Sequence, residues 1–342
     1  MSNNYILAII TALISIISTP LVRKLAIKVN AIDVPKEARR VNTRPIPVLG
    51  GLAIYIAFVI GTILYNGILT TSQIGIIIGA TIIVIGGIID DIKDLRPKYK
   101  LIIQVLAAVC LIVSGVKITV ITNPFVELYP YLSMGWINIP LTIIWIVGVT
   151  NAFNLIDGLD GLAAGIAFIS SVTLMIVSIL NGRLEAAFLT AVLSGAILGF
   201  LPYNFNPASI FMGDTGSQLL GFLLAAISIE GAIKSATAFV IAVPILAFGL
   251  PIYDTLFAMI RRKVNGKSIM QADRGHLHHR LLDMGLSQKQ VVVIMYLISA
   301  VLGGIAIIAM QISTQRAYFL LTLVIIIIVL VAWKYGIFSH KE

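Results

Sequence analysis

Long runs of Ile, Leu, Val and Ala, separated by short polar stretches, occupy most of the chain. A membrane-crossing helix needs about 20 apolar residues, because the hydrocarbon core is about 30 Å thick. Eleven runs approach this length, and their number favours helices over buried strands. We therefore predict an all-α polytopic membrane protein, with about 11 transmembrane helices in a single domain over residues 1–342. The predicted spans cover residues 4–22, 46–65, 73–89, 100–115, 137–153, 160–180, 184–201, 211–229, 235–256, 290–311 and 316–334.

The composition agrees with this pattern. The chain is 59% hydrophobic and 11% charged, whereas a soluble domain carries about 25% charged residues. Its mean hydropathy is +1.03. These values exclude a soluble globular enzyme and a disordered chain. They also indicate that the net charge of +9 is explained by the membrane and not by binding to nucleic acid. The only cysteine, Cys110, allows no intramolecular disulfide bond.

The basic residues predict the orientation. If successive runs cross in alternate directions, 20 of the 24 Lys and Arg residues lie on one side. The positive-inside rule makes that side cytoplasmic, with the N-terminus outside and the C-terminus in the cytoplasm. No Lys or Arg precedes the first run, which argues against a cleavable signal peptide. The cytoplasmic loops that carry the predicted site cover residues of about 23–45, 90–100, 151–161, 202–215 and 257–289.

Acidic residues are also concentrated on one side. All ten aspartates lie on or beside the predicted cytoplasmic loops, and the opposite side has only Glu127, Glu185 and Glu230. The positive-inside rule does not predict this, because Asp and Glu contribute little to orientation. Acidic groups near a membrane are costly and usually mark function. Chemistry is therefore expected at the cytoplasmic face.

The first motif is the adjacent pair Asp90-Asp91, at the inner end of the third run. Neighbouring carboxylates in a partly desolvated position repel each other unless they share a cation, and oxygen donors suit Mg²⁺ or Mn²⁺. The simpler alternative is a solvated helix end whose acids pair with Lys93, Arg96 and Lys98.

In the second motif, Asn151, Asn154, Asp157 and Asp160 recur every third position, which predicts one polar stripe on a helix. Polar groups at membrane depth must find partners, so the stripe indicates a ligand site. Hydrogen bonding between helices is the alternative, and it applies best to Asn151. The glycines that accompany the motif fit a helix break or a close approach of the backbone to a ligand.

The third motif runs from Phe211 to Ser217 and opens the eighth run. Asp214 is either an N-cap or a metal ligand, and a helix N-terminus also suits phosphate. Phe211 is either a platform for a flat base or a lipid-facing side chain.

The last motifs are cationic. His276, His278 and His279 stand among Lys and Arg residues, which favours a phosphate-binding or proton-handling role over a Zn²⁺ site. Arg261, Arg262 and Lys263 are explained equally well by lipid binding and topology. In the first cytoplasmic loop, prolines stiffen the backbone, and the Lys and Arg side chains form an edge suited to an anion.

These features together indicate phosphoryl transfer between a lipid and a soluble anionic substrate, because such catalysis depends on metal and cationic positioning. A transporter or channel is the rival class. It predicts acids near the membrane midplane and an inverted repeat, and the sequence shows neither.

Four motifs in this order make the chain resemble the polyprenyl-phosphate N-acetylhexosamine-1-phosphate transferase family over essentially its whole length. They are Asp90-Asp91, the segment from Asn151 to Gly161, the segment from Phe211 to Ser217, and His276-Leu277-His278-His279. The resemblance implies a bacterial plasma-membrane enzyme that transfers a sugar 1-phosphate from a UDP-sugar to undecaprenyl phosphate and releases UMP. The product would start a cell-envelope glycan such as teichoic acid or O-antigen.

Within the family, Leu277 interrupts the histidines and an eleventh span is predicted, and both features favour UDP-GlcNAc as the donor. The alternative is the branch that transfers phospho-MurNAc-pentapeptide, which usually has three consecutive histidines and ten spans. The chain departs from the family at Asn42, where His is common, and at Val48, where a basic residue is common. A homodimer is compatible with the resemblance.

The resemblance also assigns roles to individual residues, with Mg²⁺ (or Mn²⁺ in its place) as the cofactor. Asp214, with Asp91 as a helper, would bind the metal, and both direct attack and a covalent Asp intermediate remain open. The catalytic candidates are Asp90, Asp91, Asp157, His276, His278 and His279, and the substrate-binding candidates are Lys100, Asn151, Asn154, Asp160, Phe211, Arg39 and Arg44.

Overall fold

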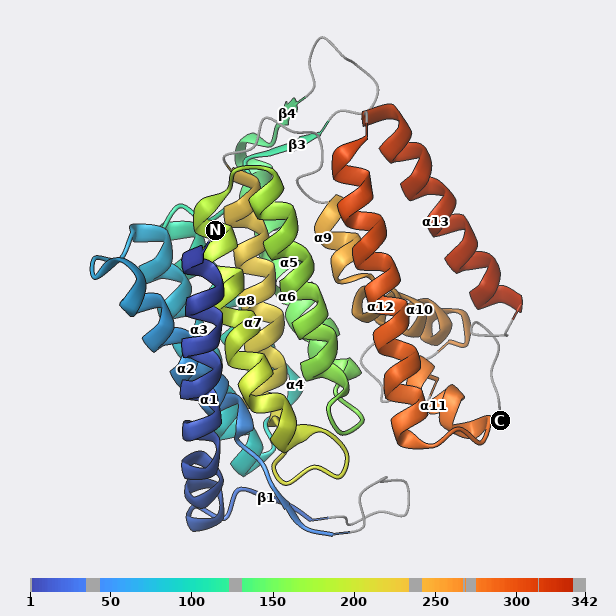
Figure 1. Ribbon diagram of the computed structural model, residues 1–342. Coiled ribbons are helices and arrows are strands. Elements are labelled where there is room, and N and C mark those ends of the chain that lie inside the picture. The colour runs from blue at the N-terminus through green and yellow to red at the C-terminus, as the bar shows by residue number, and fades with distance from the viewer. Residues whose placement is uncertain are drawn as a thin grey trace.

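The chain forms a bundle in which the successive long helices run in alternate directions (Figure 1). The computed structural model describes residues 2–34, 44–122, 131–233, 242–266, 268, 275–312 and 314–334. In these residues the only strands form two short antiparallel pairs, so the predicted all-α class is confirmed. The helices are α1 (Ser2–Lys28), α2 (Gly50–Asn66), α3 (Thr71–Lys93), α4 (Pro97–Val113), the 3-10 helix η1 (Gly135–Ile137), α5 (Asn138–Ile156), α6 (Leu162–Leu180), α7 (Leu184–Asn204), α8 (Gly213–Ile233), α9 (Ala242–Ala247), α10 (Gly249–Val264), α11 (Leu277–Asp283), α12 (Gln288–Gln311) and α13 (Thr314–Lys334). The strands are β1 (Ile32–Asp33), β2 (Ile46–Pro47), β3 (Val120–Thr122) and β4 (Tyr131–Ser133).

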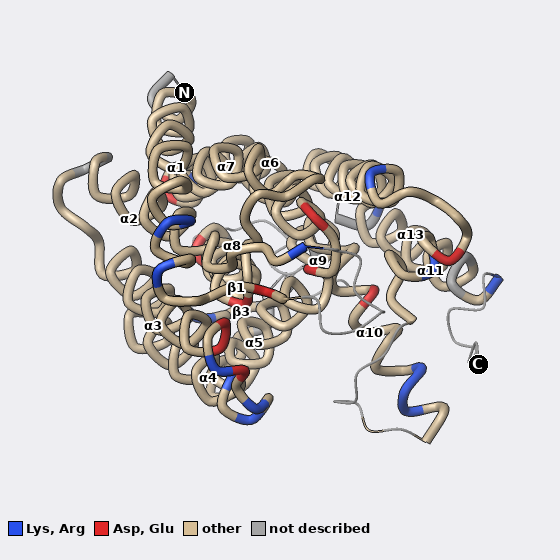
Figure 2. Tube along the Cα trace, turned by 90° about the horizontal axis from the view of Figure 1, so that it is seen from below, with Lys and Arg blue, Asp and Glu red and all other residues tan. Residues whose placement is uncertain are grey.

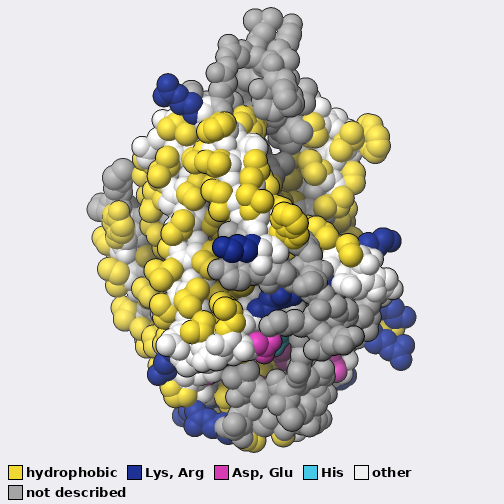
Figure 3. Space-filling view, turned by 90° about the vertical axis from the view of Figure 1, so that its right-hand side faces the viewer, with side chains coloured by type: hydrophobic (Ala, Val, Ile, Leu, Met, Phe, Trp, Pro, Cys, Tyr) yellow, Lys and Arg dark blue, Asp and Glu magenta, His cyan; other side chains and the backbone are white. Residues whose placement is uncertain are grey.

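The helices are those of an integral membrane protein. Among the described residues, six helices are long and apolar enough to cross a membrane, and the apolar parts of α2 and α13 are shorter. Seen from below, acidic and basic residues lie close together around the ends of α3 and α4 (Figure 2). One side of the molecule is covered largely by hydrophobic side chains, with its acidic and histidine side chains gathered in the lower part (Figure 3). The count of eleven spans stays a prediction.

Two helix boundaries near the N-terminus differ from those predicted from the apolar runs. Helix α1 continues to Lys28, six residues past the predicted end, because charged residues remain compatible with a helix after it leaves the apolar layer. The second helix starts at Gly50 and not at residue 46. Pro45 and Pro47 cannot donate backbone hydrogen bonds, and Ile46–Pro47 pairs instead with Ile32–Asp33 as a short ribbon.

The predicted ninth span, residues 235–256, is not one continuous helix. Residues 235–241 lie outside the described residues, and the rest is divided between α9 and α10 at Phe248. Pro251 explains the break, because it has no amide hydrogen to donate to the carbonyl of Ala247 four residues earlier. The chain changes direction at this point, so α10 packs against α5 and α12 (Figure 1).

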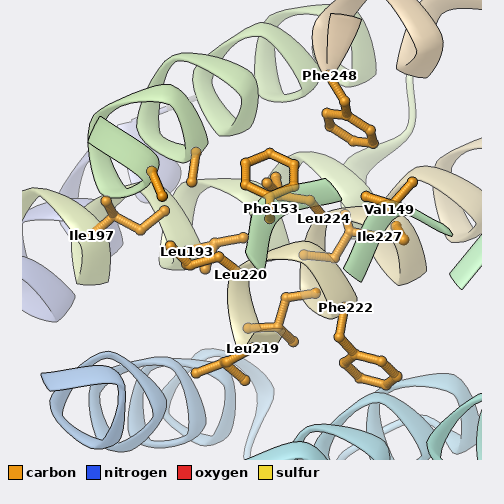
Figure 4. Close-up of a cluster of buried hydrophobic side chains, with 14 of the residues drawn as sticks. Val149, Phe153, Leu193, Ile197, Leu219, Leu220, Phe222, Leu224, Ile227 and Phe248 are labelled. Carbon is orange, nitrogen blue, oxygen red and sulfur yellow. The ribbon is translucent and has the colours of Figure 1, made fainter. Parts of the chain in front are cut away.

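The centre of the bundle is built around α8, which packs against α3, α5 and α2. Large buried side chains fill this region, among them Phe153, Phe222 and Phe248 (Figure 4). Glycines let the helices approach the start of α8. A Cβ on Gly51 would lie 2.2 Å from the Cα of Gly216, and one on Gly87 would lie 2.4 Å from the Cα of Thr215. This close packing places the N-terminus of α8 among the ends of α2 and α3.

Candidate active site

A lysine joins two carboxylates where α3 ends and where α4 and α8 begin. The Nζ atom of Lys100 lies 2.6 Å from Oδ2 of Asp90 and 2.5 Å from Oδ2 of Asp214. The Asp90 side chain is almost fully buried at 2% exposure, and its other oxygen accepts a hydrogen bond from the amide of Leu95 at 2.7 Å. The structure therefore brings together three predicted site residues that are separated by up to 124 positions in the sequence.

Asp214 is held from a second side by α5. The Nδ2 group of Asn154 donates hydrogen bonds to Oδ1 of Asp214 at 2.6 Å and to Oγ of Ser217 at 2.9 Å. The Asp214 side chain is still 30% exposed, in contrast to that of Asp90. Asp214 can thus be reached by a ligand from outside the protein, whereas Asp90 cannot.

The N-terminus of α8 is capped by a residue of α3. Asp91 accepts hydrogen bonds from the amides of Asp214 and Thr215, at 2.8 and 3.2 Å, and from the Thr215 hydroxyl at 2.6 Å. A carboxylate at a helix N-terminus is stabilised by the unpaired amides and the helix dipole. The interpretation of Asp214 as an N-cap is therefore wrong, because α8 begins at Gly213 and Asp214 lies inside its first turn. The Asp91 side chain caps the helix instead, and both its oxygens accept hydrogen bonds there.

Asp157 follows the last residue of α5 and faces the same cluster. Its side chain accepts no hydrogen bond from any residue that the structure describes. Burial first, and then the charges of three neighbouring aspartates, raise the pKa of the Asp157 carboxyl to about 8. Those neighbours are Asp214, Asp91 and Asp160. Without a bound cation, Asp157 therefore carries a proton for most of the time at neutral pH.

The predicted single stripe from residue 151 to residue 160 is interrupted. Helix α5 ends at Ile156, and Gly161 adopts a left-handed conformation with φ of +77°, so a break replaces the expected helical continuation. The Asp160 carboxylate turns to the loop before α8. Its Oδ2 accepts hydrogen bonds from Nδ2 of Asn206 and from the amide of Ala208, both at 3.0 Å. Asp160 therefore holds the loop that carries the third motif.

Asn151, at the other end of the predicted stripe, bonds to protein groups within the bundle. Its Nδ2 group donates to Oε1 of Gln104 at 2.7 Å and to the carbonyl of Val147 at 2.8 Å. This is the hydrogen bonding between helices that the sequence left open as an alternative. The predicted substrate contact of Asn151 stays a prediction.

The histidine motif starts at α11. Nδ1 of His276 lies 2.7 Å from Oδ2 of Asp254 on α10, and the other oxygen of Asp254 accepts from the amide of Leu277 at 2.9 Å. Asp254 therefore both orients His276 and caps the N-terminus of α11. The rings of His278 and His279 lie 4.2 Å apart.

His278 stands against the turn that follows Asp157. A Cβ on Gly158 would lie 2.5 Å from Nε2 of His278, so a larger residue there would displace the imidazole ring. His278 is 2% exposed, and neither ring nitrogen has a hydrogen-bond partner in the described part of the chain. Burial, followed by the charge of His279, lowers the pKa of His278 to about 3. The ring is neutral at physiological pH and keeps one nitrogen as donor and the other as acceptor.

This burial predicts how stability depends on pH. The unfolded His278 binds a proton below its ordinary pKa of about 6.5, whereas the folded one does not, so the contribution of His278 is complete above pH 6.5 and is lost as the pH falls toward 3. The free energy of unfolding should fall by up to about 1.4 kcal/mol per pH unit below pH 6.5 from this residue. Thermal unfolding in detergent from pH 7 to pH 5 measures it. The decline should be shallower in His278→Gln, and parallel profiles for the two proteins would contradict the prediction.

The remaining predicted contacts lie at the edge of the cluster. The backbone of Phe211 pairs with the stiff segment before α2, because its amide donates to Pro47 at 2.8 Å and its carbonyl accepts from Gly50 at 2.9 Å. Nη2 of Arg44 donates to the carbonyl of Ala208 at 3.4 Å, so this arginine also supports the loop before α8. Arg39, like Asn42, lies outside the described residues.

The donors of the cluster fit Mg²⁺ shared with a phosphate substrate. Among the residues the structure describes, no group of three or more His, Cys, Asp or Glu side chains converges on one point to hold a metal alone. Mg²⁺ is usually bound by one or two carboxylates together with water and substrate phosphates. Asp214 is accessible and Asp157 has unpaired oxygens, and all these donors are oxygen atoms.

Sequence reasoning missed several supporting residues. Gln104 and Gln218 are buried polar groups inside apolar runs, which is the signal that marked Asn151 and could have marked them. Asn206 also received no role, although its amide bridges Asp160 and Gln288 at 3.0 and 2.7 Å. Asp254 is one of the ten aspartates near the predicted cytoplasmic side, and its contact with His276 is visible only in the fold.

Comparison with known proteins gives consistent matches. The model of "Glycosyl transferase family 4" matches residues 73–232. A probable undecaprenyl-phosphate N-acetylglucosaminyl 1-phosphate transferase of Bacillus subtilis is 41% identical over 97% of this chain and 92% of its own length. A decaprenyl-phosphate N-acetylglucosaminephosphotransferase of Mycolicibacterium smegmatis is 35% identical over 84% of the chain and 77% of its own length. A phospho-N-acetylmuramoyl-pentapeptide-transferase of Halalkalibacterium halodurans is 30% identical over 87% and 94%.

Proposed function

The chain belongs to the polyprenyl-phosphate N-acetylhexosamine-1-phosphate transferases, of the glycosyl transferase family 4 type, and from this membership we propose that it transfers GlcNAc-1-phosphate from UDP-GlcNAc to undecaprenyl phosphate and releases UMP. The single observation that carries the choice of substrates is the 41% identity to the Bacillus subtilis protein over 97% of the chain. Its family thus makes the chain a membrane-bound phosphotransferase, and this excludes the hypothesis of a transporter or channel.

The MurNAc-pentapeptide branch is the second candidate for the donor. Its representative is 30% identical, which is well below the value for the N-acetylglucosaminyl transferase. Leu277 also separates His276 from His278, whereas that branch usually has consecutive histidines. Both observations support UDP-GlcNAc and the start of a cell-envelope glycan such as teichoic acid or O-antigen.

The residues of the cluster have distinct tasks in this proposal. Asp214, with Asp157, would hold Mg²⁺, which when bound would neutralise charge on the diphosphate of the donor. Lys100 orients Asp214 and adds a second positive charge beside it. His278, buried against Gly158 with a neutral ring, would hold the turn after Asp157 in place. Asp91 keeps the N-terminus of α8 in place by accepting hydrogen bonds from its first amides.

The reaction needs little help from a base. An oxygen of the lipid phosphate attacks the sugar-bearing phosphorus of UDP-GlcNAc, the bond from that phosphorus to the bridging oxygen breaks, and UMP leaves with this oxygen. A phosphate monoester has a second pKa near 6, so the attacking group is largely dianionic at neutral pH. Asp90 is paired with Lys100 and with the Leu95 amide, and it is 2% exposed. This supports direct attack, with Asp90 as a positioning group and not as a covalent nucleophile.

We further propose that the cluster faces the cytoplasm of a bacterium, with eleven spans and the N-terminus outside. The 20 Lys and Arg residues on one side support this orientation. The alternation of helix directions in Figure 1 is consistent with it, because the ends of α3 and α5 meet the starts of α4 and α8.

UMP release from purified protein in detergent tests the proposal. With undecaprenyl phosphate and Mg²⁺ we expect UMP from UDP-GlcNAc, and little from UDP-GalNAc or UDP-MurNAc-pentapeptide. EDTA should abolish the release, and added Mg²⁺ or Mn²⁺ should restore it. Turnover only with UDP-MurNAc-pentapeptide would overturn the choice of donor. Folded protein that releases no UMP from any of the three would overturn the proposed reaction, and unchanged activity in EDTA would remove the metal from it.

A further inference from the structure

Three amide side chains form a layer inside the bundle, next to the group of Asp90, Lys100 and Asp214. Nε2 of Gln104 donates to Oδ1 of Asn151 at 3.3 Å and to Oε1 of Gln218 at 3.0 Å, and Oε1 of Gln104 accepts from Asn151 at 2.7 Å. Gln104 and Gln218 are 1% and 3% exposed. These two amides are therefore too deeply buried to contact a substrate, and their hydrogen bonds serve the protein itself.

Each member of this amide layer lies one helical turn from Asp214 or from a residue that binds Asp214. Gln104 and Lys100 are four residues apart on α4, Gln218 and Asp214 are four apart on α8, and Asn151 and Asn154 are three apart on α5. Residues three or four apart share a helix face. The same three helices therefore meet twice, once through amides and once through the groups around Asp214.

We propose that the amide layer fixes the register of α4, α5 and α8, so that Gln104, Asn151 and Gln218 are positioning residues for the phosphotransfer. The inference rests on the function proposed above. A rotation or slide of any one helix breaks hydrogen bonds of the layer and moves Lys100, Asn154 or Asp214 by a similar distance.

The physical basis is the directionality of the amide bonds. In a bilayer, apolar packing between helices competes with equally apolar lipid, and it tolerates small rotations. Hydrogen bonds between buried amides have narrow limits of distance and angle. A single buried polar contact is known to select one register among several well-packed ones. Here the selected register brings the ammonium of Lys100 between Asp90 and Asp214.

The test compares variants that separate positioning from stability. Gln104→Leu removes the centre of the layer, so Gln218 loses its amide partner and Asn151 keeps only its hydrogen bond to the carbonyl of Val147. The triple variant Gln104→Leu, Asn151→Leu, Gln218→Leu removes the whole layer and leaves no orphan amide, so its melting temperature should recover toward wild type. The readouts are kcat and KM for UDP-GlcNAc in the UMP assay, together with the melting temperature of the purified protein.

We expect both variants to lose about 10-fold or more in kcat with KM changed less than about threefold, because a small misplacement of catalytic groups lowers the rate strongly. Ser228→Ala is the matched control. Ser228 accepts a hydrogen bond from Nε1 of Trp145 at 3.2 Å, which joins the same helices α5 and α8 farther from the cluster. It should keep kcat near wild type.

The outcomes separate the two proposals. If the wild-type protein is active and the triple variant keeps the wild-type kcat, the positioning role is overturned and the proposed function stands. An equal loss of kcat in Ser228→Ala overturns it as well, since any lost contact between helices would then suffice. If Gln104→Leu does not fold, the triple variant and Gln104→Asn, which keeps the amide but shortens its reach, decide the question by the same readouts. An inactive wild-type protein overturns the proposed function, and this inference with it.

Discussion

Asp214→Asn is expected to lower kcat for UMP release on the order of 1,000-fold, the largest effect of any single substitution in the cluster. Asp214 is the accessible carboxylate, and its two oxygens meet Lys100 and Asn154. The substitution keeps the shape of the side chain but removes its charge. The cluster then loses its predicted metal ligand and the acceptor that Lys100 needs. Turnover at saturating UDP-GlcNAc and Mg²⁺ measures the effect.

Asp94→Asn is the matched control for this experiment. Asp94 is an exposed carboxylate at the same end of the bundle, immediately after α3, and its backbone is left-handed with φ of +52°. Asn adopts that conformation more readily than most residues, so the control should fold normally and keep its activity. Near-normal turnover by Asp214→Asn, or equal losses in both variants, would refute the assignment of Asp214.

Lys100→Met should lower kcat on the order of 100-fold, the second largest effect. The variant preserves the length of the side chain but removes the only cation that lies between Asp90 and Asp214 among the described residues. Asp90 is then a buried carboxylate without its ionic partner, which costs several kcal/mol unless it takes up a proton. We therefore expect the melting temperature to fall as well, and the UMP assay with thermal unfolding records both changes.

Two variants of the same helix make this result specific. Lys98→Met removes an exposed cation that lies over the ring of Tyr99, and it should leave kcat unchanged. Lys100→Arg retains the charge and should recover part of the lost activity. If Lys100→Met loses stability but its folded fraction turns over at the wild-type rate, Lys100 has a structural role only.

The arrangement explains how a site can be built where a helical bundle meets water. Four carboxylates and a lysine gather there, and each carboxylate has a different environment. Asp90 is buried against Lys100, Asp91 caps α8, and Asp214 is partly exposed. Asp157 has no described hydrogen-bond donor and a raised pKa. Four residues of one type can therefore perform four tasks, because burial and neighbours differ at each position.

The family of the chain could be recognised from the sequence, because its motifs are short and contiguous. Asp90-Asp91 and the segments around Asn154 and Asp214 each lie at the end of an apolar run, and such ends meet at one face when helices alternate. The all-α class followed from the length of the apolar runs alone. The helix ends were less predictable, because Pro251 and Pro47 act through single missing amide hydrogens that the apolar pattern does not register.

The sequence by itself determined the membrane class, the family, the positions of most helices and the list of candidate site residues. Local features suffice for these, since hydropathy and motif spacing are properties of neighbouring residues. Only the tertiary structure decided which candidates meet. It placed Asn151 in the amide layer, turned Asp160 to Asn206, occupied Asp91 with the start of α8, and set Lys100 between Asp90 and Asp214. The physical reason is that a hydrogen bond or ion pair depends on distances of about 3 Å between different helices, and no periodicity within one segment of the chain encodes such a distance.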